Sequence, residues 1–180
     1  MATFIMLPNG DVLQQWDASG GGTSSYTDVD NDNGDTEYAF SNTTGERMIV
    51  DLAAPIDASL VDTVNSVTIK ASAIKTFTGD SFVTFRQIGT AADSSLISNG
   101  SDTITVTASG SYATISGTVE TTSDGSDAWV YGDLAGLQIR VDKFRNDRFG
   151  EVRISYLYAY VGFTPTTAVA DNATFFGANF

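Results

Sequence analysis

The sequence has no cysteine and no histidine among its 180 residues. Their absence excludes disulfide bonds, cysteine nucleophiles, Ser-His-Asp triads and zinc sites of the usual kind, all of which need thiolate or imidazole groups. Apolar runs of about 18 residues, which a transmembrane helix needs, are also missing. The apolar N-terminus is too short for a secretory signal and has no preceding basic residues. We therefore expect a chain that is synthesised in the cytoplasm and folds without crosslinks.

Basic residues are scarce. The chain has 9 Lys and Arg against 22 Asp and Glu, which gives a formal net charge of −13. Nucleic acids and anionic membranes carry charge of the same sign, so we expect neither as a partner. The 42% of hydrophobic and 11% of aromatic residues are too many for a disordered chain. The length fits one globular domain that has its own core.

Glutamate is rare as well, although aspartate is abundant. A glycosidase could work with two carboxylates alone, and its general acid is often a glutamate in an apolar pocket. The four glutamates lie near the expected strand ends or in loops: Glu37, Glu46, Glu120 and Glu151. GxSxG, P-loop and GxGxxG motifs are missing too. We therefore expect a protein that is not an enzyme.

The pattern that is present is an alternation of apolar and polar residues with period two. Clusters of Gly, Asn, Asp and Ser interrupt it, as expected for half-buried strands that tight turns connect. About ten short strands are predicted, at 3–7, 12–16, 36–40, 47–52, 66–77, 81–88, 103–107, 112–120, 137–143 and 151–163. With no α/β alternation, this pattern predicts an all-β fold: an antiparallel two-sheet sandwich, jelly-roll-like, with short helical turns at 55–62 and 131–137.

Two segments give more detailed predictions. Asn9-Gly10 favours a tight turn, which would make residues 3–16 a β-hairpin. In the segment 151–163, Ile154 and the tyrosines at 156, 158 and 160 alternate with Leu157, Ala159, Val161 and Phe163. Both faces of that strand are therefore apolar, which is typical of a central strand covered on both sides.

We expect a single domain at 1–163 and an extended C-terminal arm at 164–180. The arm carries Phe175, Phe176 and Phe180, and an exposed terminus gains nothing from three phenylalanines. Two interpretations remain open. The arm either folds back onto its own sandwich or is buried against a neighbouring chain.

An acidic run at 28–37 contains the hard oxygen ligands that calcium prefers, with Asp28, Asp30 and Asp32 at the first three ligand positions of an EF-hand loop. Asn33 stands where that loop needs glycine, and Ala39 stands where it needs the bidentate glutamate. The alternative is a solvated turn in which Asn and Asp side chains cap the backbone. Calcium is the single cofactor that the sequence suggests.

Five of the nine basic residues fall within fourteen positions. They predict a basic, aromatic hairpin tip on an acidic body, and arginine and phenylalanine together are typical of protein interfaces. Together with the phenylalanines of the arm, the candidate partner-binding residues are Arg140, Lys143, Phe144, Arg145, Arg148 and Phe149. The alternative is an ordinary hairpin whose charges pair with Asp142 and Asp147.

Aromatic side chains raise the possibility of a sugar-binding module, because rings stack on pyranose faces while nearby carboxylates bind hydroxyls. The candidate glycan-binding residues are Trp129 and Tyr131 with Asp127 and Asp133. Trp16 is a further candidate ring. The alternative is that these rings fill the core, as aromatic residues do in small β domains.

The order of several segments resembles a group of β-sandwich proteins from tailed bacteriophages. The resemblance covers most of the chain and is carried by Trp16, YTDVD at 26–30, TEYAF at 36–40, SVTIKA at 66–71, WVYGDLAGLQ at 129–138 and VRISYLYAYV at 152–161. It implies that 129–138 is a short helical connection and that 152–161 is the closing strand. The basic tip and the phenylalanine-rich arm are not part of the shared pattern.

This resemblance implies a non-enzymatic virion structural protein of the capsid decoration (cement) or head-fibre type. Its expected location is the virion surface, and its expected partners are the major capsid protein and further copies of itself, as a dimer or trimer at a symmetry axis. The alternative function is a glycan-binding adsorption domain of a tail or head fibre. A calcium-dependent glycosidase is the third and weakest hypothesis.

Overall fold

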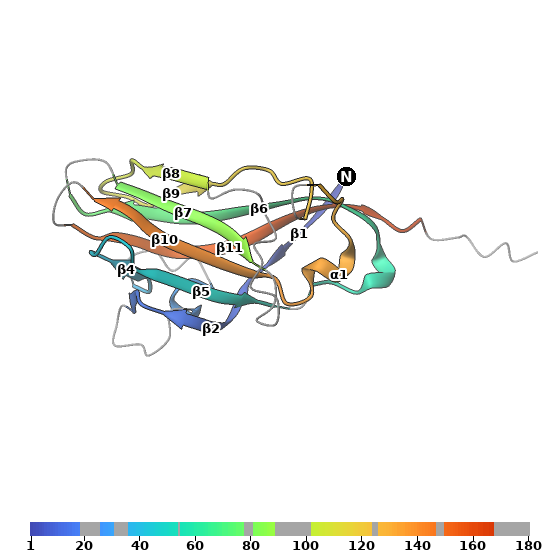
Figure 1. Cartoon of the computed structure of the whole chain (residues 1–180), viewed down its shortest axis with the longest axis horizontal. Helices are drawn as coiled ribbons and strands as arrows, with labels where there is room; N and C mark the ends of the chain where they lie inside the picture. Colours follow the sequence, from blue (N-terminus) through green and yellow to red (C-terminus); the bar gives the residue numbers. More distant parts are fainter. Residues whose placement is uncertain are drawn as a thin grey trace, which may run out of the picture.

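The computed structural model describes residues 1–18, 26–30, 36–53, 55–77, 81–88, 102–123, 126–146 and 150–167. These residues form two antiparallel β-sheets that face each other as a sandwich (Figure 1). The predicted all-β, jelly-roll-like fold is confirmed. None of the described helices is long and apolar enough to cross a membrane.

Six strands form the first sheet, which we call sheet A. They run in the order β3-β4-β11-β6-β9, with β1 also paired to β11. Their bounds are β1 (Ala2–Met6), β3 (Asp17–Ala18), β4 (Ala39–Ser41), β6 (Val61–Lys75), β9 (Ala113–Ser116) and β11 (Val152–Pro165).

Five strands form the second sheet, sheet B, in the order β2-β5-β10-β7-β8. Their bounds are β2 (Pro8–Gln14), β5 (Arg47–Leu52), β7 (Ser81–Ile88), β8 (Asp102–Val106) and β10 (Gln138–Asn146). Within the described segments, three short helical turns lie in connections: η2 (Tyr26–Asp28), η3 (Ala58–Leu60) and α1 (Tyr131–Leu134). The last two confirm the helical turns predicted at 55–62 and 131–137.

The core lies between the sheets and follows from strand alternation. In β10, Ile139 and Val141 are fully buried, whereas the alternate residues Arg140 and Asp142 point outward and are partly exposed. Val67 and Ala71 of β6 face the same core from sheet A. Trp16 and Trp129 complete the core, and each is at most 2% exposed.

The predicted N-terminal hairpin is wrong. β1 pairs with β11 in sheet A, whereas β2 pairs with β5 in sheet B, so the chain crosses between the sheets at Leu7. The backbone N–H of Ala53 donates to the carbonyl of Leu7 at this crossing. Gly10 lies inside β2 at an irregularity in its pairing with β5, and it does not adopt the positive φ of a tight turn.

β11 is central in sheet A, as predicted. It pairs with β6 along its length and with β4 and β1 on its other side. The expected alternation fails at Ile154, because a bulge between Ile154 and Tyr156 turns Ile154 into the core. The expectation that both faces are covered is also wrong, since Tyr156, Tyr158 and Tyr160 are only partly buried. The strand continues to Pro165, two residues beyond the expected domain boundary.

Candidate functional site

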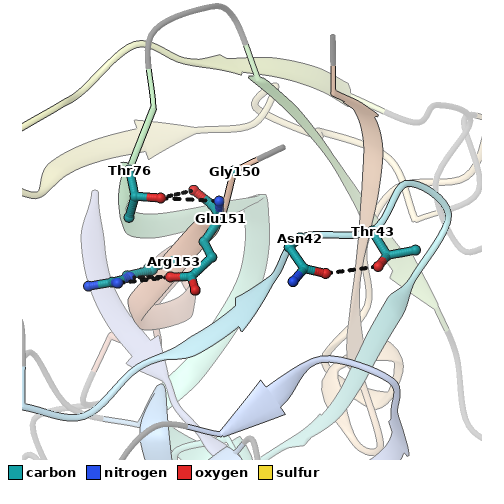
Figure 2. A pocket seen from close by; sticks show the side chains of 6 residues that line it. All are labelled: Asn42, Thr43, Thr76, Gly150, Glu151 and Arg153. Carbon is teal, nitrogen blue, oxygen red and sulfur yellow. Dashed lines mark hydrogen bonds and ion pairs between the residues drawn. The ribbon is translucent and has the colours of Figure 1, made fainter. Parts of the chain in front are cut away.

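At the end of the sandwich opposite α1, connections from distant parts of the chain meet (Figure 1). A hollow lies between them (Figure 2). It is open to solvent and has a volume of about 510 Å³. Most of its lining residues carry polar side chains: Asn42, Thr43, Thr76, Gly150, Glu151 and Arg153. We call it the end hollow.

The ends of three strands of sheet A position these residues. Asn42 and Thr43 follow β4 in the turn to β5, where Gly45 adopts a φ of 91° and donates its N–H to the carbonyl of Lys143. That left-handed conformation favours glycine. Thr76 follows β6, while Glu151 and Arg153 lie where β11 begins. Because β4 and β6 both pair with the first residues of β11, these three ends meet at one place.

Glu151 is the centre of the hydrogen bonds within the end hollow. Its Oε2 accepts bonds from Nε and Nη2 of Arg153, at 2.9 and 2.8 Å. Its backbone N–H donates to Oγ1 of Thr76 at 3.1 Å. The second carboxylate oxygen, Oε1, has no hydrogen-bond partner within the part of the chain that the structure describes. In Figure 2 the Glu151 carboxylate lies between the Arg153 guanidinium and the pair Asn42–Thr43, so an acceptor is available to a ligand in the hollow.

A buried lysine supports the floor of this region. The Lys143 side chain is fully buried, and its ammonium donates to the carbonyls of Ser41 at 2.9 Å and of Gly150 at 3.0 Å. Burial lowers the pKa of Lys143 from 10.5 to about 8, although Glu46 and Glu151 oppose that shift. The lysine thereby ties the end of β4 to the start of β11, the two strand ends that carry most of the lining.

An aromatic surface begins beside the end hollow and continues along the outer face of sheet A. The Arg153 guanidinium carbon lies 4.5 Å from the centre of the Tyr38 ring, which in turn packs edge-on against Phe40 at 5.9 Å. Farther along β11, the rings of Tyr156 and Tyr158 are 4.7 Å apart. The ammonium of Lys70 lies 4.4 Å from the centre of the Tyr160 ring. We call Tyr156, Tyr158 and Tyr160 the tyrosine row.

Gly150, which lines the end hollow, has room for only a hydrogen atom where other residues carry Cβ. A Cβ added there would overlap the ring of Phe77. We expect Gly150→Ala to lower the free energy of unfolding by about 1–3 kcal/mol, since the ring must move. Gly132→Ala is the matched control, because its Cβ would meet open space, and it should change stability by less than about 1 kcal/mol. Urea denaturation compares the two variants. Equal effects would contradict the packing of Phe77 against Gly150.

Among the predicted partner-binding residues, the structure describes the side chains of Arg140 and Lys143, and neither lies at an exposed tip. Lys143 shares the inward face of β10 with Ile139 and Val141, so its prediction as an exposed binding residue is wrong. Arg140 lies on the outer face of sheet B, where its guanidinium donates to both carboxylate oxygens of Asp142. Asp142 also forms an ion pair with Arg47 at 3.2 Å. Phe144 and Arg145 belong to β10, and nothing is described of their side chains. The other predicted residues lie outside the described residues: Arg148, Phe149, Phe175, Phe176 and Phe180.

The predicted glycan-binding cluster is wrong in its principal ring. Trp129 is 2% exposed, and its indole N–H donates to the carbonyl of Glu120 at 3.1 Å. Tyr131 is partly buried, packs against the core and donates its hydroxyl to the carbonyl of Ile56. Asp133 caps α1 by accepting from the N–H of Val130, and Asp127 is exposed. Hydrophobic packing at this end of the sandwich core accounts for the positions of both rings.

The calcium prediction remains open. Asp28 is buried beside β11, where the carbonyl of Val29 accepts a bond from the N–H of Leu157. Asp30 is partly exposed, and Asp32 lies outside the described residues. Among the residues that the structure does describe, no group of three acidic side chains could hold a metal ion.

Little in the sequence indicates the end hollow. Glu151 is one of four glutamates, and Arg153 is one of the five basic residues at 140–153. Asn42, Thr43 and Thr76 stand alone in turn sequences without a motif. The available signal was the Glu-x-Arg pattern at 151–153, which places two opposite charges on one side of a strand start.

The chain matches no known family and no curated protein. It is similar to a CBM36-1 domain of a multidomain xylanase from the hindgut metagenome of Trinervitermes trinervoides, with 7% identity, 91% of this chain and 98% of that chain covered, and a TM-score of 0.49. It is also similar to CBM32 of AlyQ in complex with 4,5-unsaturated mannuronic acid, with 16% identity, coverages of 85% and 97%, and a TM-score of 0.44.

A further similar structure is the CBM22-1 xylan-binding domain from Paenibacillus barcinonensis Xyn10C, with 9% identity, coverages of 89% and 94%, and a TM-score of 0.42. None of these three structures is a phage virion protein. The chain's own structure establishes the sandwich fold. The link to phage proteins stays a prediction, and the proposal about function rests on the geometry of the site.

Proposed function

We propose that this chain is a non-catalytic carbohydrate-binding domain whose site is the end hollow. The observation that carries the proposal is an open polar hollow that borders an aromatic surface. Sugar-binding sites need hydrogen-bonding groups for hydroxyls together with flat apolar surfaces for the ring faces. Here Arg153 belongs to both parts, because it lines the hollow and stacks on Tyr38.

The chemistry of the lining suits neutral polyols. A sugar hydroxyl both donates and accepts hydrogen bonds, so it requires acceptors and donors side by side. Oε1 of Glu151 is an acceptor, and the Asn42 amide N–H groups are donors. The hydroxyls of Thr43 and Thr76 donate to Asn42 Oδ1 and to the Glu151 carbonyl, and each can still accept. The pair between Glu151 and Arg153 holds the carboxylate in place, which lowers the cost of ordering it when a ligand binds.

The same lining argues against hydrolysis. Glycosidases use two carboxylates, separated by about 5–5.5 Å in retaining enzymes and about 6.5–9.5 Å in inverting enzymes. Of the described residues that line the end hollow, Glu151 alone is a carboxylate, and its near oxygen is bound to Arg153. The hollow thus offers one fixed acceptor and lacks an acid–base pair, which fits binding.

A glycan-binding screen of the wild-type domain tests this proposal, followed by calorimetry on the best ligand. We expect Glu151→Gln to weaken binding roughly tenfold or more, because a hydrogen bond to a charged group is worth about 1.5–3 kcal/mol. Asp62→Asn removes one charge at the opposite end of β6 and should bind like wild type. Failure of the wild-type domain to bind any glycan would refute the proposal. Equal weakening by both variants would place the site elsewhere.

Capsid decoration remains the prediction that the phage resemblance implies. Of its expected attachment residues, Lys143 is buried and Arg140 is held by Asp142. We expect cosedimentation with capsids that lack this protein to decide the question, with Arg145→Glu/Arg148→Glu and a deletion of 170–180 as variants. Saturable binding that either change abolishes would favour decoration, and no binding by wild type would reject it.

A further inference from the structure

We propose that the ligand is an extended chain of sugar rings, which runs from the end hollow along β11 over the tyrosine row. This inference rests on the proposed function and makes it more specific. It assigns a role in binding to Tyr156, Tyr158 and Tyr160, and it names the ligand class as a linear oligosaccharide or polysaccharide.

The first argument is the alignment of the row. The bulge at Ser155 places Tyr156 on the same outward face as Arg153, and Tyr158 and Tyr160 follow at every second residue. All three tyrosines are partly exposed, while Leu157 and Ala159 between them and Val161 after them are fully buried. The strand therefore presents rings, and only rings, at the outward positions from 156 to 160.

The second argument is the polar border of the row. Strand pairing sets Ser72 opposite Tyr156 and Lys70 opposite Tyr158 in β6. The next strand, β9, sets Thr114 beside Ser72 and Ser116 beside Lys70. Directly paired residues lie on the same face of a sheet, so hydroxyl and ammonium groups flank the rings on one side. Each ring thus has polar groups beside it, as stacked sugar rings with peripheral hydroxyls require.

The third argument is continuity with the end hollow. Arg153 lines that hollow and stacks on Tyr38, and it precedes Tyr156 on the same outward face. From Arg153 to Tyr160 the strand extends about 20 Å at its usual rise per residue. That distance exceeds the size of one sugar ring several times over. A ligand that occupies both features must therefore be a chain of several rings.

The composition of the face favours a glycan over a protein partner. Protein interface cores are enriched in tyrosine but depleted in lysine and serine. Here Lys70 and Ser72 lie directly beside the tyrosine row, and Ser116 lies one strand farther out. Lys70 stacks on Tyr160, and Ile5 of β1 pairs with Tyr160 on the other side of β11. The neutral hydroxyls of Ser72 and Thr114 lie on the side of β6 and β9.

The test measures the Kd of wild type for a series of oligomers of the best glycan, from one ring to about six, by calorimetry. We expect the Kd to fall roughly five- to tenfold with each added ring that reaches a tyrosine and then to level off. Tyr158→Ala should abolish most of that gain, while Tyr158→Phe should retain it because the ring remains. Tyr131→Ala removes a partly buried tyrosine near α1 and should leave the length dependence unchanged.

The outcomes separate this inference from the proposed function. If wild type binds the single ring and the longest oligomer equally, the end hollow binds glycans and the tyrosine row does not. An unchanged length dependence in Tyr158→Ala would also overturn the inference, provided that the thermal unfolding of the variant shows a folded domain. Absence of binding to every glycan would refute the proposed function itself.

Discussion

Relative to a Lys143→Met variant, the wild-type protein is expected to gain about 3 kcal/mol of folding stability between pH 8 and pH 10.5. The folded-state pKa of Lys143 is about 8, and the ordinary value of 10.5 applies to the unfolded chain. Between these values the unfolded state binds more protons, so stability rises with pH. The contribution is complete above pH 10.5 and is lost as the pH falls through about 8.

Urea denaturation of both variants between about pH 7 and pH 11 measures this difference, and subtraction removes the titration of groups that the two share. Lys75→Met is the matched control, because it removes another buried lysine and leaves Lys143 in place. It should keep the wild-type rise in stability. Parallel curves for wild type and Lys143→Met would show that the Lys143 ammonium is hydrated in the folded protein, contrary to its position between the sheets.

Trp129→Ala is expected to lower the free energy of unfolding by about 4 kcal/mol. The indole is 2% exposed, so the substitution leaves a large cavity at one end of the core. It also removes the N–H that donates to the carbonyl of Glu120, which accepts a second bond from the N–H of Val67. Chemical denaturation measures the loss, with unfolding monitored by circular dichroism because the substitution changes the tryptophan fluorescence.

The adjacent residue gives the control for Trp129. Val130 is 59% exposed, so Val130→Ala should change stability by less than about 0.5 kcal/mol. A Trp129→Ala protein of wild-type stability that no longer binds glycans would mean that the indole contacts ligand. That result would restore the sugar-binding role predicted from the sequence and contradict the buried position of the ring.

Strand positions could be predicted because burial of one face imposes period-two alternation. The predicted strands at 47–52 and 81–88 have the same bounds as β5 and β7. Pairing could not be predicted, since alternation describes one strand without its neighbours. Asn9-Gly10 has the composition of a tight turn, yet the partners of β1 and β2 lie in different sheets, and tertiary pairing overrides that local preference.

The candidate site was less predictable than the fold. Its lining comes from three strand ends that are far apart in the sequence, and no motif connects them. Lys143 illustrates a signal that was available. Ile139, Val141 and Lys143 share one face of a strand, and that alternation indicated burial, whereas the count of nearby basic residues suggested exposure. Ile154 shows the opposite case, because one extra residue at Ser155 shifts the alternation without any trace in the composition.

The pairing of β1 with β11 also constrains how the chain reaches its native state. Ala2 to Met6 align with Phe163 to Ala159, so contacts close a loop that spans most of the chain. Loop closure on that scale costs entropy before the contacts compensate for it, and folds dominated by such contacts reach the native state in milliseconds to seconds. During synthesis, β1 must wait until β11 has left the ribosome. The final assembly of sheet A therefore waits for the synthesis of β11, the last of its strands in the sequence.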